Sequence, residues 1–327
     1  MGFDDSALDD QDRLDAYGER LRDLALCGAR LRSSDHARCG NAAALIDRPR
    51  AILAVGPEAR LLRAVVEPTC PVPFVAWPMP SLPSWVGPLD LVVALAGADD
   101  RLANLISDAR RRGAQVLLVA PSTSPVVERV TPEQTVLVSS EDPFVQALLA
   151  LKVLDSAGLA PEVDLVAVAD ALDATADDCG PRRPLGSNPA KELACALADT
   201  VPLIWGKSVL AARASRRIAE AVREATFYPA LAADDVAIEP LIAFSGVRDL
   251  FEDPVETPSS SIRYSLLLLD DRNPESVSVD LASVAQSRGV RVVTIQHSEG
   301  SPVERYAVIL SQGLFAALWL HVANAGG

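Results

Sequence analysis

Lysine, histidine and aromatic residues are all scarce in this 327-residue chain. It has three lysines (Lys152, Lys191 and Lys207), three histidines and 5% aromatic residues. Acidic residues outnumber basic ones, and the formal net charge of −14 at pH 7 argues against binding to nucleic acid or to an anionic membrane. The histidines are spread along the sequence and form no ligand motif, so we expect neither a bound metal nor a cofactor.

The cysteines give no sign of disulfides or zinc. The five of them form no CxxC pair, and an odd, scattered set is typical of reduced thiols in a cytosol. No uninterrupted apolar run reaches the roughly 20 residues that cross a bilayer. The N-terminal segment MGFDDSALDDQD is too acidic for a signal peptide. The sequence therefore predicts a cytoplasmic globular protein, long enough for two domains.

Strands and helices alternate in the first half of the chain. The clearest unit is residues 89–120, where an apolar strand, a small-residue loop, an amphipathic helix and a second strand follow one another. A helix over 10–26 is expected to precede the sheet. The other expected elements are strands at 50–55, 71–77 and 135–138, and helices at 58–65, 100–112 and 143–157.

The second half repeats the same order of elements. We expect a connecting helix at 164–176, strands at 201–205, 265–269 and 291–295, and helices at 189–198, 208–225, 278–286 and 303–323. The proline- and glycine-rich segment CGPRRPLGSNP lies between the halves and is the clearest linker. We therefore predict an N-terminal domain over 1–155, a connecting helix and linker over 156–188, and a C-terminal domain over 189–327. An internal duplication explains the repeat economically.

Four segments make a family resemblance specific. Residues 71–75 (PVPFV) and 82–93 (LPSWVGPLDLVV) resemble the approach to the sugar-phosphate loop of bifunctional phosphoglucose/phosphomannose isomerases. Residues 188–194 (NPAKELA) and 201–206 (VPLIWG) are similar to the opening of that family's second domain. The divergent actinobacterial, TobH-like members associated with mannose metabolism look most similar. The resemblance implies an α/β fold of two flavodoxin-like sugar isomerase (SIS) domains, each a mostly parallel sheet flanked by helices.

The same resemblance implies a phosphate-binding loop after the strand at 89–95. The family's loop is rich in hydroxyls, whereas residues 94–99 here read ALAGAD and keep only Gly97. Asp99 and Asp100 stand where a phosphate dianion is expected, and two like charges about 4 Å apart repel by about 4 kcal/mol at an effective dielectric of about 20. The two carboxylates alternatively cap the following helix. A metal site on them has no histidine cluster to support it.

Two other loops supply the remaining ligand-binding candidates. Ser122, Thr123 and Ser124 follow the next strand and offer hydroxyls, or else form an ordinary polar turn. Gly56 stands in a loop where the family has several glycines. Here Pro57 removes an N–H donor from that loop and Glu58 adds negative charge.

Catalytic candidates come from the resemblance alone. Glu220 aligns with the family's proton-transferring glutamate and Arg213 with the start of the same helix, although Glu220 also suits a solvent-exposed face paired with arginines. The family's ring-opening histidine is missing, so Asp234, Asp235 or His297 would have to replace it, and no lysine follows Lys207.

Two functions remain open at this point. The first is a non-catalytic SIS-fold protein with a binding or regulatory role in sugar-phosphate or mannose metabolism. The second is an active aldose–ketose isomerase with a rebuilt site around Glu220. A sugar phosphate or related small molecule, a second copy of the chain in a homodimer, and a mannose-pathway enzyme are the expected partners. Fold alone does not decide between them. The missing hydroxyls in the loop at 94–99 favour the first function.

Overall fold

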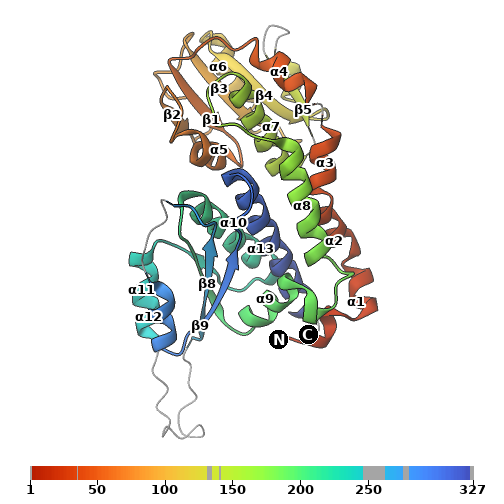
Figure 1. Ribbon diagram of the computed structural model, residues 1–327. Helices are drawn as coiled ribbons and strands as arrows, with labels where there is room; N and C mark the ends of the chain where they lie inside the picture. Colours follow the sequence, from red (N-terminus) through yellow and green to blue (C-terminus); the bar gives the residue numbers. More distant parts are fainter. Residues whose placement is uncertain are drawn as a thin grey trace, which may run out of the picture. The chain divides into compact units, whose positions relative to one another are not determined.

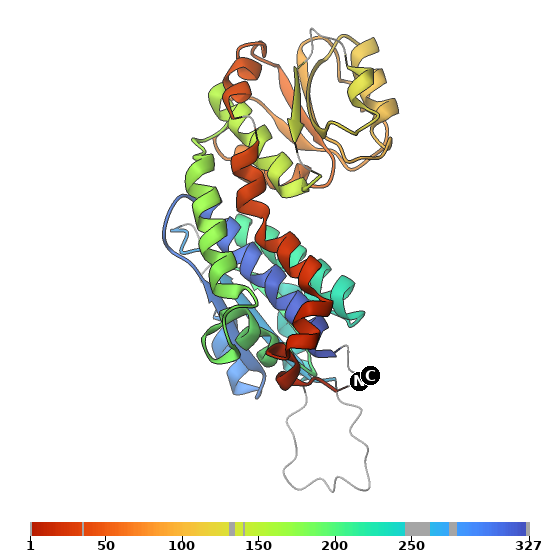
Figure 2. The same cartoon turned by 90° about the vertical axis from the view of Figure 1, so that its right-hand side faces the viewer.

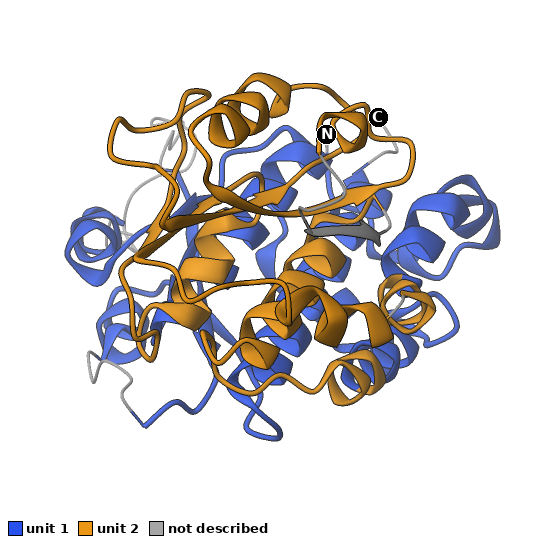
Figure 3. Ribbon diagram, turned by 90° about the horizontal axis from the view of Figure 1, so that it is seen from above, with its two compact units in different colours: residues 1–26, 171–327 blue, residues 27–170 orange. Residues whose placement is uncertain are grey.

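The chain folds into two compact units, drawn in different colours in Figure 3. The structure, a computed structural model, describes residues 2–34, 36–130, 135–139, 141–245, 262–274 and 280–324. Unit 1 consists of Met1–Leu26 with Ala171–Gly327, and unit 2 of Cys27–Asp170. The boundary at 170/171 falls within helix α8 (Leu165–Cys179). This division groups residues by their contacts. The domain limits 1–155 and 189–327 expected from the sequence remain a prediction.

A five-stranded parallel sheet forms the centre of unit 2. Its strand order is β2-β1-β3-β4-β5, the flavodoxin-like order. Val55 at the end of β1 pairs with Ala94 near the end of β3, which fixes the register of the sheet's carboxyl edge. The strands are β1 (Ala51–Val55), β2 (Phe74–Ala76), β3 (Asp90–Leu95), β4 (Gln115–Pro121) and β5 (Thr135–Ser139).

Helices cover both faces of this sheet. On one face α6 (Ala103–Arg111) packs Leu105 and Ile106 into a cluster with alternate residues of β1, β3 and β4. The other face contacts α5 (Ala59–Val66) and α7 (Pro143–Ser156), and α4 (Ala37–Ala43) packs against α7 and β5. Strands buried on both faces read as continuous apolar runs, which explains AILAV and DLVVAL. Short helices α3 (Cys27–Ser33) and η2 (Val127–Arg129) complete the described part of the unit.

Unit 1 contains a second parallel sheet, in the order β7-β6-β8-β9. Its strands are β6 (Val201–Gly206), β7 (Leu231–Ala232), β8 (Tyr264–Asp270) and β9 (Arg291–Gln296). Counted within each unit, the order of the first four strands is the same in the two sheets, which agrees with an internal duplication. One face carries α11 (Asp235–Phe244) and α12 (Leu281–Ser287), whose apolar residues join Trp205 and Leu268 in one core cluster.

The opposite face of this sheet is covered by the long helices of unit 1. α10 (Val209–Thr226) contacts β6 and β8 and lies beside α13 (Pro302–Asn324) in Figures 1 and 2. α13 also packs against α9 (Pro189–Leu197), α2 (Gly18–Ala25) and η1 (Asp5–Leu8). Helices α1 (Gln11–Ala16) and η3 (Leu185–Ser187) are short connections.

Most expected elements are confirmed within a few residues, with three corrections. The helix expected over 10–26 is two helices, α1 and α2, which meet at Tyr17. The helix expected from residue 100 begins at Ala103, because the loop after β3 continues through Asp100. Helices α3 and α4 and strand β7 were not expected. Residues 278–279 of the helix expected at 278–286 lie outside the described residues.

Helix α13 also corrects the expectation about membrane spans. By length and hydropathy it is apolar enough to cross a membrane, although no uninterrupted apolar run of that length exists. However, 72% of its most apolar window is buried inside the structure. Phe315 and Trp319 are completely buried. This burial is that of a core helix.

Candidate functional site

The carboxyl edge of the unit 2 sheet is the first candidate. Ligands of open parallel sheets bind where the strand order reverses, here between the ends of β1 and β3. Gly56 lies at this point with a φ of 109°. A Cβ built on it would lie 2.1 Å from the Leu95 carbonyl oxygen. The glycine is therefore required by the close approach of two chain segments, and this role needs no ligand.

Gly97 and Ser124 come together at the same edge. Ser124 is buried, and its hydroxyl donates a 2.5 Å hydrogen bond to the Gly97 carbonyl oxygen. The buried amide of Gln146 donates to the Ala96 carbonyl oxygen at 3.1 Å. These bonds join the loops after β3 and β4, so the Ser124 hydroxyl is already used within the protein.

Ser122 and Thr123 are the only two exposed hydroxyl groups of the 122–124 loop, which the structure describes completely. Close by in sequence to Gly97, Asp99 pairs with Arg101 at 3.0 Å and accepts a hydrogen bond from the Arg101 N–H. Leu102 occupies the capping position of α6 and makes no side-chain capping bond. The expectation that Asp99 or Asp100 caps this helix is therefore wrong: the Asp99 carboxylate stabilises the preceding turn.

Glu220 and Arg213, the catalytic candidates, lie on α10 in unit 1. Glu220 accepts a 2.7 Å hydrogen bond from the Arg217 guanidinium, and its side chain is 40% exposed. Arg213 is buried two helical turns earlier on the same side of the helix. The Asp234 carboxylate lies 3.9 Å from the Arg216 guanidinium. The backbone N–H of His297 donates a hydrogen bond to the Asp270 carbonyl oxygen.

The acid–base candidates lie on different elements of unit 1, Glu220 on α10 and Asp235 on α11. Among the described residues, no hydrogen bond or ion pair joins Glu220 to Asp234, Asp235 or His297. Groups of three or more side chains suited to hold a metal ion are also absent from that part of the chain.

A second polar edge, at the carboxyl ends of β6 and β8, was missed by the sequence analysis. The strand order of unit 1 reverses between these two strands, so their ends form the equivalent switch point. Ser208 follows β6 and donates a 2.6 Å hydrogen bond to Asp271 Oδ2, which follows β8. Lys207 Nζ donates to Asp270 Oδ2 at 2.9 Å. The signal was present as GKS after one apolar strand and DDR after the next.

Asp270 is held ionised at this edge. Burial acts to raise the pKa of its carboxyl, but hydrogen bonds from the Lys207 ammonium and the Arg272 N–H, with both positive charges, outweigh burial and lower the pKa. Asp271 differs, because it is 1% exposed and its Oδ1 has no hydrogen-bond partner among the residues that the structure describes. A buried carboxylate oxygen without a donor costs free energy, so this atom needs an explanation.

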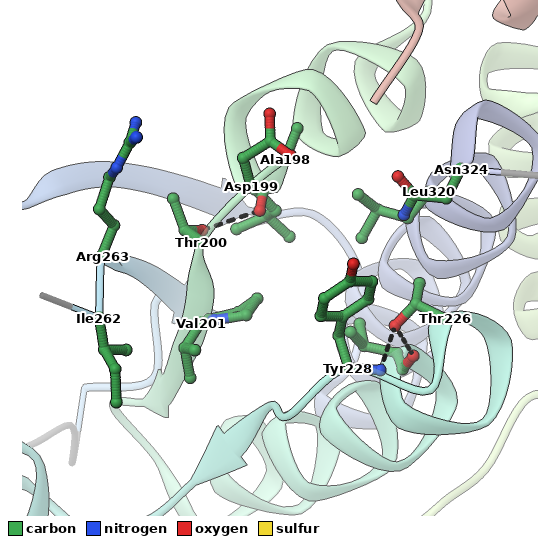
Figure 4. Close-up of a pocket in the computed structure, with 13 residues that line it drawn as sticks. Ala198, Asp199, Thr200, Val201, Thr226, Tyr228, Ile262, Arg263, Leu320 and Asn324 are labelled. Carbon is green, nitrogen blue, oxygen red and sulfur yellow. Dashed lines mark hydrogen bonds between the residues drawn. The ribbon is translucent and has the colours of Figure 1, made fainter. Parts of the chain in front are cut away.

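A cavity of about 300 Å³ opens at the other end of the same sheet. Figure 4 shows Val201, Thr200, Tyr228 and Leu320 around it, with the Arg263 guanidinium turned away from Tyr228. Because the cavity lies at the amino ends of β6 and β8, it is not where parallel sheets hold their ligands. We assign no site to it.

Comparison with known proteins identifies the fold. Residues 186–324 match the family described as the bacterial phospho-glucose isomerase C-terminal SIS domain. Over these residues the chain is similar to a SIS domain. No curated protein sequence matches it.

Solved SIS-type structures extend the likeness over nearly the whole chain. A tagatose-6-phosphate ketose/aldose isomerase from Escherichia coli is 14% identical, with a TM-score of 0.61 over 99% of this chain and 92% of its own. A glucose-6-phosphate isomerase-like protein from Thermus thermophilus is 16% identical, with a TM-score of 0.53 over 86% of each chain. The C-terminal domain of glucosamine-fructose-6-phosphate aminotransferase from Francisella tularensis is 10% identical, with a TM-score of 0.62 over 96% of this chain and 95% of its own. At such identities the SIS likeness shows the fold alone.

Proposed function

We propose that this SIS-type protein binds a sugar phosphate or related small molecule without isomerising it, and so has a binding or regulatory role in sugar-phosphate metabolism. The observation that carries the proposal is the loop after β3. It offers no side-chain hydroxyl from Ala94 to Asp100 and carries two exposed carboxylates instead. A phosphate dianion docked there would meet negative charge, which opposes binding in the family's usual mode.

The surroundings of Glu220, the candidate catalytic glutamate, support the same proposal. Proton transfer between neighbouring carbons needs a base aimed at the substrate and an acid–base group that opens the sugar ring. Glu220 is paired with Arg217 on a partly exposed helix face. The Glu220 carboxylate is therefore already hydrogen-bonded to a neighbouring side chain of its own helix.

The proposed assembly and cellular setting complete this account. We place the protein in the cytoplasm as a homodimer, next to an enzyme of mannose metabolism, in the manner of divergent actinobacterial TobH-like members. The homodimer rests on the SIS resemblance alone. Helix α13 is apolar, but it is largely buried within the chain and so offers no free apolar face for a subunit interface.

The test compares wild-type protein with Glu220→Gln. Both are incubated with glucose 6-phosphate and mannose 6-phosphate, and the ketose product is measured together with the melting temperature. We expect a rise in melting temperature, because a ligand that binds only the folded state stabilises it by mass action. We expect no turnover by either protein. Turnover that depends on Glu220 would establish the alternative, an active isomerase with a rebuilt site.

A further inference from the structure

The carboxyl edge of β6 and β8 has features that the corresponding edge of unit 2 lacks. Two cationic side chains, Lys207 and Arg272, lie at its mouth with side-chain exposures of 32% and 56%. The loops of the unit 2 edge carry Asp99 and Asp100 in the same place, with the exposed Arg101 paired to Asp99. Lys207 and Arg272 balance the carboxylates of Asp270 and Asp271 at the unit 1 edge, whereas Asp99, Asp100 and Arg101 leave one net negative charge at the unit 2 edge.

The N-terminus of α10 lies at this edge and has unused donors. The helix is 18 residues long, and Gly206 lets the preceding chain turn tightly against it, since a Cβ there would lie 2.1 Å from the Ala211 carbonyl carbon. Ser208 caps the helix by accepting a hydrogen bond from the Ala211 N–H. Within the described part of the chain, the N–H groups of Val209 and Leu210 have no acceptor. Such donors, with the helix dipole, favour an anion.

Asp271 supplies the second and independent observation. Its Oδ2 accepts a hydrogen bond from the Ser208 hydroxyl, whereas its buried Oδ1 accepts none from the described part of the chain. Asp271 also makes no ion pair among the described residues. A carboxylate oxygen in this condition needs an O–H or N–H donor from outside the chain.

We infer that the β6–β8 edge, and not the β1–β3 edge, is the ligand site, and that it takes an anionic polyol of the sugar-phosphate class. The open N–H groups of α10, Lys207 and Arg272 bind the phosphate, and Asp271 Oδ1 accepts a hydrogen bond from a sugar hydroxyl. Arg272 has a φ of 49°, a left-handed conformation that a non-glycine residue adopts at some cost in free energy. The Asp270 carboxylate holds it there by accepting from its N–H at 3.0 Å. The partly exposed side chains of Lys207 and Arg272 move to admit the ligand.

This inference rests on the proposed function. Calorimetric titration with mannose 6-phosphate, glucose 6-phosphate and inorganic phosphate tests the assignment of the ligand site. We expect Asp271→Asn to weaken sugar-phosphate binding about tenfold or more, the loss of one hydrogen bond to a charged group, and to leave inorganic phosphate binding less affected. Lys207→Gln should weaken both the sugar phosphates and inorganic phosphate. Thr123→Ala, which removes an exposed hydroxyl at the unit 2 edge, is the matched control and should change neither.

The outcomes separate the two proposals. Sugar-phosphate binding that survives Asp271→Asn and Lys207→Gln unchanged but is weakened by Thr123→Ala overturns the inference and leaves the proposed function intact. The absence of binding to wild-type protein removes both. The melting temperature without ligand shows whether Asp271→Asn folds, and Lys207→Gln changes a partly exposed side chain that the core does not need.

Discussion

Lys191 carries its charge in a completely buried position of unit 1. Its ammonium donates to Asp9 Oδ1 at 2.6 Å and to the Arg183 carbonyl oxygen at 2.9 Å, and it lies 4.5 Å from the centre of the Trp319 ring. Asp9 also accepts from the Leu185 N–H. Burial acts to raise the pKa of Asp9, but these hydrogen bonds outweigh it and lower the pKa. The family-like motif NPAKELA therefore has a structural role here, connecting the N-terminal segment to α9 and α13.

The two ends of this ion pair should respond differently to mutation. Asp9→Ala leaves the buried Lys191 charge without its carboxylate, and we expect a loss in unfolding free energy near the lower end of about 3–5 kcal/mol. Lys191→Met leaves Asp9, whose side chain is 45% exposed, to be solvated. We expect that loss to be below about 2 kcal/mol. Urea denaturation of both variants measures the difference, and an equal or reversed order would contradict the asymmetry.

His321 makes the stability of unit 1 depend on pH. Burial lowers its pKa, the positive charge of Arg20 lowers it further, and a hydrogen bond with the Ala225 backbone opposes both. The His321 ring packs edge-on against the Tyr17 ring, and the two ring centres are 5.1 Å apart. Because the folded state binds this proton less readily than the unfolded state, the free energy of unfolding should fall as the pH drops through about 6.5, the unfolded pKa.

Comparing wild type with His321→Gln between pH 8 and pH 5 isolates this contribution. The wild type should lose more stability over that range than the variant does. Parallel pH dependences would show that His321 contributes nothing to the slope.

Site residues were predictable only where the family motif directed attention. The loops of Gly56, Gly97 and Ser122–124 were found by the resemblance, but the close approach of Gly56 to Leu95 depends on strand register, which sequence does not give. Asp271 and Ser208 are 63 residues apart, and only the pairing of β6 with β8 brings them together.

At the scale of elements, α10 and α13 pack closely because Gly313 has no side chain. A Cβ at this position would lie 2.3 Å from Ile218 Cδ1 and 2.5 Å from its Cγ1. Ile218 is buried, so its side chain has little room to move. Alanine is favoured over glycine in a helix by about 1 kcal/mol, which opposes the clash.

We expect Gly313→Ala to destabilise the protein by about 1–2 kcal/mol net, since overpacking a core costs about 1–3 kcal/mol. Ile218→Val removes the methyl group nearest to the new Cβ. The double variant should therefore be more stable than the sum of the two single changes predicts, in thermal or urea unfolding. Additive effects would mean that α10 and α13 move apart at Gly313 with no loss of stability.

Elements were predicted well where apolar periodicity was long. Helices α7, α10 and α13 and strands β1, β3, β4, β6 and β8 follow from their patterns, because burial on one or both faces dictates them. Helices α3 and α4 lie in the segment 27–43, which is rich in arginine and small residues and has few apolar positions. Their helical state depends on packing against α7, which local sequence does not reveal.

At the scale of the whole molecule, the proposed homodimer has a direct test. The mass of one chain is 34.6 kDa, and light scattering at micromolar concentration should give about twice this value. A mass near that of one chain would contradict the dimer. It would leave the ligand site intact, because every residue assigned to that site belongs to unit 1 of a single chain.

The most direct test of the central claim is a proton NMR spectrum of mannose 6-phosphate incubated with the wild-type protein in D₂O. One spectrum reports both binding and chemistry. Our account predicts broadening of the sugar signals that saturates with protein concentration, with no fructose 6-phosphate signals and no loss of the C2 proton to solvent. Steady appearance of fructose 6-phosphate, abolished by Glu220→Gln, would contradict it and establish an active isomerase.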